Sequence, residues 1–152
     1  MFDILAFLFE QYFTLDNCPD RGTLAKRLSA AGFEEQEIDE ALDWLNEFEE
    51  LDATPYIALD ALPLLPRVLH PREAARLTPD AQAFFHYLSS SGALGTGQRE
   101  LLVDRLMQST LLQLDESAVK RVALMVLWRH GDDLANLLIE ELLFAGDAAP
   151  MH

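Results

Sequence analysis

Ten carboxylate side chains fall between residues 34 and 52 of the 152-residue chain. No lysine or arginine occurs between Arg27 and Arg67, so these carboxylates have no basic neighbour along the sequence. A dense row of carboxylates can bind a basic protein surface or can simply be solvated. Acid–base catalysis would need two carboxylates whose pKa values are held apart, and a solvated row provides no such environment. The acidic residues are Glu34, Glu35, Glu37, Asp39, Glu40, Asp43, Glu47, Glu49, Glu50 and Asp52.

A second group of side chains is basic and follows in residues 67–76. It consists of Arg67, His70, Arg72 and Arg76, which on a hairpin could contact phosphates. The whole chain, however, holds 11 Lys and Arg against 26 Asp and Glu, a net charge of −15. A surface with this balance repels the polyanionic backbone of nucleic acids, so nucleic acid is disfavoured as a partner. We expect the three arginines to pair instead with the acidic residues 34–52.

The other reactive side chains match no catalytic or metal-binding motif. The four histidines, at 70, 86, 130 and 152, include no pair three or four residues apart, and Cys18 is the single cysteine. One cysteine forms neither an intramolecular disulfide nor a multi-cysteine zinc site. The glycines at 95 and 97 lack the lysine of a phosphate-binding loop. We therefore predict no enzymatic activity, no metal and no cofactor.

Hydrophobic periodicity predicts an all-α chain of about seven helices, the third of which carries the acidic residues. Residues 1–52 are predicted to form three helices with a tight turn at Gly32, in a helix-turn-helix-like unit. The third helix, about 34–50, has an apolar stripe on one face, and Trp44 lies beside it. The stripe consists of Ile38, Ala41, Leu42, Leu45 and Phe48.

The rest of the chain is predicted as a linker followed by a bundle. Residues 53–78 contain four prolines, which exclude a long helix, so we expect a wing or linker. In a wing, Tyr56–Leu59 and Arg67–Leu69 would pair as a short β-hairpin and complete a winged helix-turn-helix. Residues 79–146 are predicted as a four-helix bundle that starts at Thr78–Pro79 and packs around an almost wholly apolar helix at 119–128. Residues 147–152 are predicted as a frayed tail.

The chain contains the motifs Met1-Phe2-Asp3-Ile4-Leu5, Ala31-Gly32-Phe33, Ala41-Leu42-Trp44-Leu45 and Glu140-Glu141-Leu142-Leu143-Phe144. With these motifs, which are spread over most of its length, it resembles the bacterial Smg family. The resemblance implies a bacterial cytosolic protein and brings with it no catalytic or binding residue. The first ten residues are mostly hydrophobic but lack the basic stretch of a signal peptide, and their apolar run is too short to span a membrane. We therefore expect a cytoplasmic protein without a membrane partner.

These observations favour a non-enzymatic protein–protein interaction or regulatory module that docks a basic partner through the acidic face of the third helix. Trp44 would be its apolar anchor, although a core tryptophan and a merely solvated face are the alternatives. The alternative function is a nucleic-acid-binding regulator that uses Arg67, Arg72 and Arg76. The candidate partner-binding residues are Glu35, Glu37, Glu40, Asp43, Trp44 and Glu47.

Overall fold

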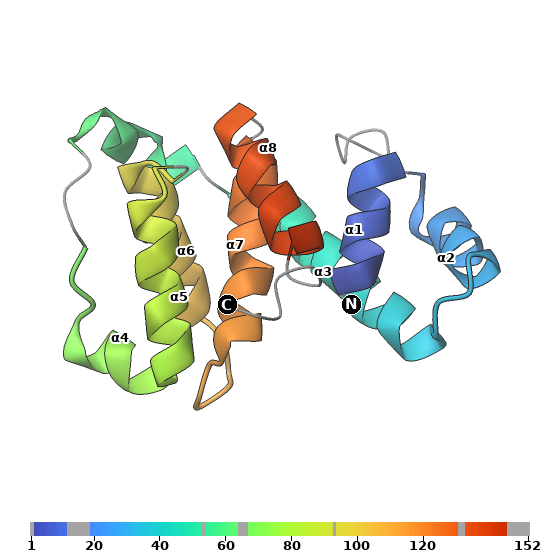
Figure 1. Ribbon diagram of the computed structural model, residues 1–152, viewed down its shortest axis with the longest axis horizontal. Helices are drawn as coiled ribbons and strands as arrows, with labels where there is room; N and C mark the ends of the chain where they lie inside the picture. Colours follow the sequence, from blue (N-terminus) through green and yellow to red (C-terminus); the bar gives the residue numbers. More distant parts are fainter. Residues whose placement is uncertain are drawn as a thin grey trace. The chain divides into compact units, whose positions relative to one another are not determined.

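The computed structural model describes residues 2–11, 19–52, 54–63, 67–92, 94–130 and 133–145, and this part of the chain is all-α as predicted (Figure 1). Cys18 and the predicted tail 147–152 lie outside it. The helices are α1 (Phe2–Gln11), α2 (Arg21–Ala30), α3 (Glu35–Glu50), α4 (Pro71–Arg76), α5 (Pro79–Ser90), α6 (Thr96–Met107), α7 (Glu116–His130) and α8 (Asp133–Glu140). A 3₁₀ helix, η2 (Thr54–Ala61), and a π-helical turn, η3 (Glu141–Ala145), complete the set.

The helices divide into two compact units. Unit 1 comprises Met1–Leu51 and Ile139–His152, and unit 2 comprises Asp52–Leu138. The boundary between the units after Leu51 lies one residue before the predicted boundary, which follows residue 52. The stretch predicted as a wing or linker belongs to unit 2, and η3, which was expected at the end of the four-helix bundle, contacts α1 in unit 1.

Unit 1 is built on α1 and α3, with α2 packed against α3. Ile4, Leu5 and Leu8 on α1 are fully buried. Gly32 has a φ of 97°, which lets the chain leave α2 and enter α3 within a few residues, and glycine adopts this backbone conformation without strain. The predicted tight turn at Gly32 is therefore confirmed.

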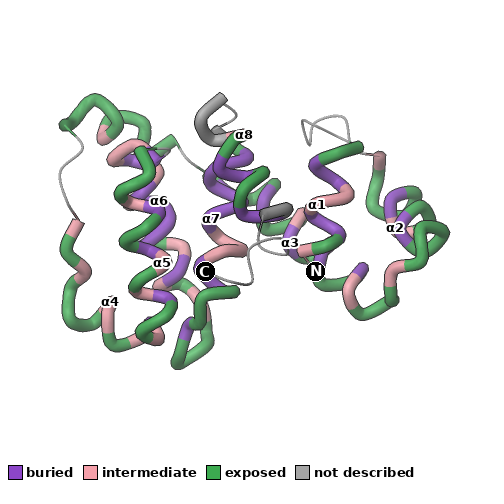
Figure 2. Tube along the Cα trace, viewed as in Figure 1, coloured by how far each residue is buried: buried purple, intermediate pink, exposed green. Residues whose placement is uncertain are grey.

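Unit 2 is built around α7, against which α5 and α6 pack. Every residue from 123 to 128 is buried, and Figure 2 shows the middle of α7 in purple. A helix that is enclosed by others needs an apolar surface on all sides. The prediction of a central helix at 119–128 is thus confirmed.

The predicted β-hairpin is wrong. Tyr56–Leu59 lie in η2, residues 67–70 form no strand, and the single bridge among the described residues joins Leu77 to Leu114. η2 instead packs against α6 (Figure 1). The Asp60 carboxylate accepts a hydrogen bond of 2.8 Å from the backbone N–H of Gly97, in the first turn of α6. Because the first N–H groups of a helix lack partners within it, η2 satisfies a donor that a hairpin would leave open.

A glycine at position 97 makes this contact possible. A Cβ atom there would lie 2.1 Å from the carbonyl oxygen of Tyr56, far inside van der Waals contact. Farther along the same interface the Tyr56 hydroxyl donates a hydrogen bond of 2.7 Å to the Asp104 carboxylate. Two hydrogen bonds therefore hold η2 on α6, and the close backbone approach at residue 97 requires glycine.

The second part of the predicted linker also folds. α4 begins with a capping box, in which His70 Nδ1 accepts from the backbone N–H of Arg72 at 3.1 Å. The Glu73 carboxylate in turn accepts from the backbone N–H of His70 at 2.7 Å. Pro71 occupies the first helical position, where its missing N–H is no loss. Pro71 therefore begins the short helix α4, although the prolines of this stretch exclude a long helix.

Replacing Gly97 by alanine should destabilise unit 2 by about 1–3 kcal/mol, because the new Cβ must push η2 away from α6. Gly22→Ala on α2 is the matched control, since its Cβ would meet nothing closer than 3.6 Å. It should stabilise the protein by about 0.4–1 kcal/mol through a less flexible unfolded chain. Urea unfolding followed by circular dichroism measures both, and a Gly97→Ala protein as stable as the parent would contradict the contact.

The Tyr56 phenol should lose its proton at an unusually high pH. Its hydrogen bond to the Asp104 carboxylate, together with burial, raises the pKa of Tyr56 to about 12 from its ordinary value of 10.0. The protonated phenol is the form that this contact favours, so its contribution to stability is complete below pH 10 and is lost as the pH rises to about 12. Tyrosinate absorbance should show a step near pH 12 that Tyr56→Phe removes and Tyr87→Phe retains. A Tyr56 step at its ordinary position would mean that the hydrogen bond is absent in solution.

Candidate functional site

One side of α3 is covered with carboxylates. Its opposite side is buried and includes Ile38, Ala41 and Leu42. Because an α-helix turns by about 100° per residue, six acidic residues fall on the solvent side, and all six are exposed. Gln36 and Asn46 lie between them, and α3 contains no basic residue. We call these six residues the acidic face: Glu35, Asp39, Glu40, Asp43, Glu47 and Glu50.

The acidic face holds most, but not all, of the predicted partner-binding residues. Glu35, Glu40, Asp43 and Glu47 lie on it together. Glu37 points to another side of the helix and is half-buried. Asp39 and Glu50 belong to the face although the site prediction left them out. Asp39 lies four residues from both Glu35 and Asp43, and Glu50 lies three residues from Glu47 and seven from Asp43. This helical spacing is the signal that would have included them.

Trp44 does not serve as a surface anchor. It is 2% exposed, and its indole stacks on the ring of Phe48 with a centroid distance of 5.6 Å. Residues four apart on a helix lie on the same side, so Trp44 follows Phe48 into the core. The prediction of an aromatic anchor within the acidic face is therefore wrong, and the alternative reading of a core tryptophan is right.

Asp43 on the acidic face pairs with a basic residue of a neighbouring helix. Arg21 on α2 forms an ion pair of 3.4 Å with Asp43, in which the two side chains are 48% and 74% exposed. Exposed pairs of this kind contribute about 0–1 kcal/mol, because water competes for both partners. By sequence, unit 1 holds 3 basic and 16 acidic residues, a net charge of −13, whereas unit 2 holds 8 and 10, a net charge of −2. Nearly all of the net charge thus belongs to unit 1.

The end of α3 places negative charge where a helix tolerates it least. Its last turn contains Glu47, Glu49 and Glu50 and no basic residue. The C-terminal end of a helix carries a partial negative charge, so each acid there costs about 0.3–1 kcal/mol. The helix dipole therefore does not account for acids at this end of α3.

The predicted basic cluster is divided among internal contacts of unit 2. The Arg67 guanidinium donates to Glu100 on α6 at 2.7 Å and to Glu73 on α4 at 3.1 Å, and these carboxylates raise the pKa of Arg67. The same guanidinium lowers the pKa of Glu73 against the opposing effect of burial. The predicted pairing of Arg67 with residues 34–52 is therefore wrong, because its partners are Glu73 and Glu100.

Arg76 is used in the same unit, where it holds the loop between α6 and α7. Its guanidinium donates to the carbonyl oxygens of Met107 at 2.9 Å and Ser109 at 2.7 Å, and also to that of Leu111. Arg72 is exposed. The structure therefore does not bring the three arginines together on one phosphate-binding surface.

The part of the chain that the structure describes offers neither a cluster of metal ligands nor a membrane-spanning helix. No group of three or more His, Cys, Asp or Glu side chains there could hold a metal ion. No helix there is both long and apolar enough to cross a membrane.

Arg76 and Arg72 should respond differently to the same substitution. Arg76→Lys keeps the charge but removes the planar group that reaches three carbonyl oxygens, and should destabilise the protein by about 1–3 kcal/mol. Arg72→Lys should stay within about 0.5 kcal/mol of the parent. Thermal unfolding compares the two variants, and equal melting temperatures would argue against a stabilising role for the Arg76 hydrogen bonds to the loop between α6 and α7.

Comparison with known proteins relates the entire chain to one family. The family model described as "Protein of unknown function (DUF494)" matches residues 1–152. The chain is 39% identical to the Protein Smg homolog of Chromobacterium violaceum over 150 residues, which cover 99% of this chain and 98% of that protein. It is 40% identical to the Protein Smg homolog of Bordetella pertussis over 152 residues, all of both chains. No solved structure matches it significantly. The resemblance seen in the sequence is thus confirmed, and the chain belongs to the Smg homolog family, DUF494.

Proposed function

We propose that the chain is a cytoplasmic, non-enzymatic interaction module that docks a basic partner protein through the acidic face of α3. The observation that carries this proposal is the row of six exposed carboxylates on a helix without a basic residue. Acids in the last turn of α3 oppose the helix dipole, so helix stability does not account for them. A docking surface for positive charge would account for these acids.

The distribution of charge also supports this role. Because unit 1 carries a net charge of −13, its field attracts a basic partner beyond direct contact. At physiological ionic strength the field is screened over about 8 Å, so association should depend on salt. Electrostatic complementarity of this kind mainly raises the association rate and selects the partner.

The burial of Trp44 changes the expected strength of docking. Charged side chains that stay solvated contribute little to affinity, and strong interfaces usually contain a buried aromatic or arginine at their centre. The acidic face has no such residue. We therefore expect a moderate, rapidly reversible interaction that salt weakens, rather than a permanent complex.

A nucleic-acid-binding regulator that uses Arg67, Arg72 and Arg76 is the alternative, and it has less support. Arg67 and Arg76 are occupied by carboxylates and by backbone carbonyls, respectively. This alternative requires saturable binding of labelled duplex or single-stranded DNA or RNA at low salt, with a steep salt dependence. Our proposal expects no such binding even at low salt, and fluorescence anisotropy distinguishes the two.

Reversing charge on the acidic face should weaken binding of a basic probe. The triple variant Glu35→Lys, Glu40→Lys and Glu47→Lys should bind fluorescein-labelled oligolysine at least about tenfold more weakly, because three contacts of about 0.5–1 kcal/mol each become repulsive. The matched control changes the net charge equally at exposed acids elsewhere, through Glu10→Lys, Asp80→Lys and Glu140→Lys. Anisotropy titrations should show a much smaller loss for the control, and equal losses would contradict a local site.

A single reversal separates docking from folding. Glu50→Lys exchanges an acid for a base in the last turn of α3, so it should raise the free energy of unfolding by about 0.3–1 kcal/mol. The same variant should bind oligolysine more weakly than the parent. Urea unfolding and anisotropy measure the two effects, and a variant that is more stable and binds as tightly as the parent would exclude Glu50 from the docking surface.

A further inference from the structure

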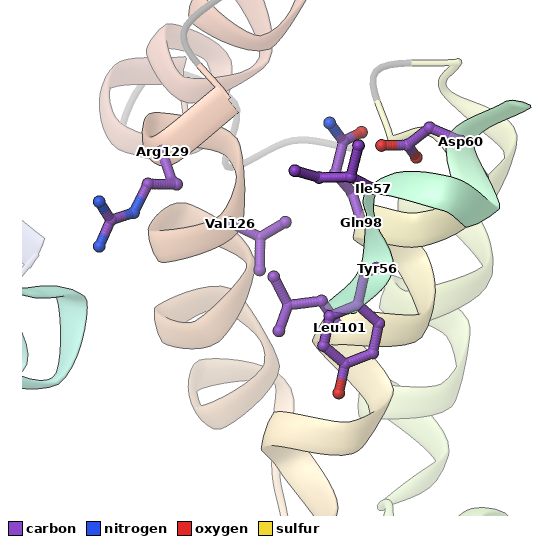
Figure 3. A pocket seen from close by; sticks show the side chains of 7 residues that line it. All are labelled: Tyr56, Ile57, Asp60, Gln98, Leu101, Val126 and Arg129. Atoms are coloured by element: carbon purple, nitrogen blue, oxygen red, sulfur yellow. The ribbon is translucent and has the colours of Figure 1, made fainter. Parts of the chain in front are cut away.

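A pocket within unit 2 takes no part in the proposed docking. It lies where η2, α6 and α7 meet, and its volume is about 160 Å³. Ile57, Leu101 and Val126, one from each helix, form its apolar walls, and Figure 3 shows these three side chains close together. Leu101 and Val126 are 5% and 1% exposed, whereas Ile57 is 63% exposed. A small molecule in the pocket would cover the exposed part of Ile57 and so gain apolar burial.

Two polar groups of the pocket lie at one end, apart from the Tyr56 hydroxyl and the Arg129 guanidinium. In Figure 3 the Asp60 carboxylate and the Gln98 amide lie together at the upper end, while the guanidinium of Arg129 extends away from the apolar walls. One Asp60 oxygen accepts from the Gly97 N–H. A carboxylate has about four lone-pair sites on two oxygens, so Asp60 keeps the capacity to accept from a ligand. The pocket thus combines an apolar body with an anionic end.

Size and charge together limit the ligand. An apolar cavity of about 150 Å³ holds one benzene-sized molecule. A single ring or a branched chain of similar size would therefore fill the space between Ile57 and Val126. Unit 2 itself has a net charge of only −2, so the Asp60 carboxylate, rather than the charge of the whole chain, selects the charge of the ligand. A carboxylate acceptor at the end of such a pocket matches an ammonium group.

We propose that this pocket binds a small primary amine with a branched or cyclic hydrocarbon body. The ammonium group hydrogen-bonds to the Asp60 carboxylate, and the hydrocarbon lies between Ile57, Leu101 and Val126. The proposal is independent of the acidic face, since all of these residues belong to unit 2. It also gives η2 a role beyond capping α6, because η2 supplies both Ile57 and Asp60.

The test uses three probes that share one branched skeleton: isoamylamine, isoamyl alcohol and isovalerate. Each is titrated into the full-length protein and followed by two-dimensional amide NMR. Isoamylamine should produce saturable shifts at millimolar concentration, the range that ligand efficiency permits for so small a molecule, centred on residues 56–60, 97–101 and 126–129. It should bind at least about tenfold more tightly than isovalerate. Absence of saturable shifts, or equal affinity for the amine and the acid, would overturn the proposal.

A matched pair of variants assigns the ammonium to Asp60. Asp60→Asn keeps an oxygen that accepts from Gly97 but removes the charge, so the affinity for isoamylamine should fall about tenfold while that for isoamyl alcohol is unchanged. Asp80→Asn alters an exposed carboxylate on α5, outside the pocket, and should leave both affinities unchanged. An Asp60→Asn protein that retains the parent's amide spectrum and its affinity for the amine would refute the assignment.

Discussion

The close contact between η2 and the first turn of α6 determines how unit 2 is built. Because residue 97 has no side chain, the backbone of Tyr56 comes close enough for Asp60 to cap α6. The same contact forms a wall of the pocket between η2, α6 and α7. Arg67 then joins the following segment to α6 through Glu100. Residues 54–63 and Arg67 are thus placed by their contacts with one helix rather than by their own helix propensity.

Unit 1 follows a different constraint, which is the need of α3 to serve two environments. Its apolar side packs in the core with Trp44 and Phe48, and its acidic face is exposed and bears like charges. Repulsion among those charges and the helix dipole both oppose the helix, so burial of the apolar side must hold it together. A partner with positive charge would relieve this repulsion, which is the physical basis of the docking that we propose.

The sequence predicts those features that depend on neighbours in the chain. Helical periodicity locates α3 and the buried middle of α7, and Gly32 marks the turn before α3. The same local reasoning fails for η2, because its partners Gly97 and Asp104 are 37 and 48 residues away. It also fails for Arg67 and Arg76, because Arg67 reaches Glu100, 33 residues away, and Arg76 reaches the carbonyl oxygen of Met107, 31 residues away. Likewise the acidic face follows from composition and spacing, whereas the burial of Trp44 depends on how α3 packs.

The central claim is that a basic partner docks on the acidic face of α3. The most direct measurement is an amide NMR titration of the full-length protein with oligolysine, at low and at physiological salt. The account predicts that the largest shifts fall on residues 35–50 and that salt reduces the affinity. Shifts spread evenly over exposed acids in both units, or centred on unit 2, would contradict it.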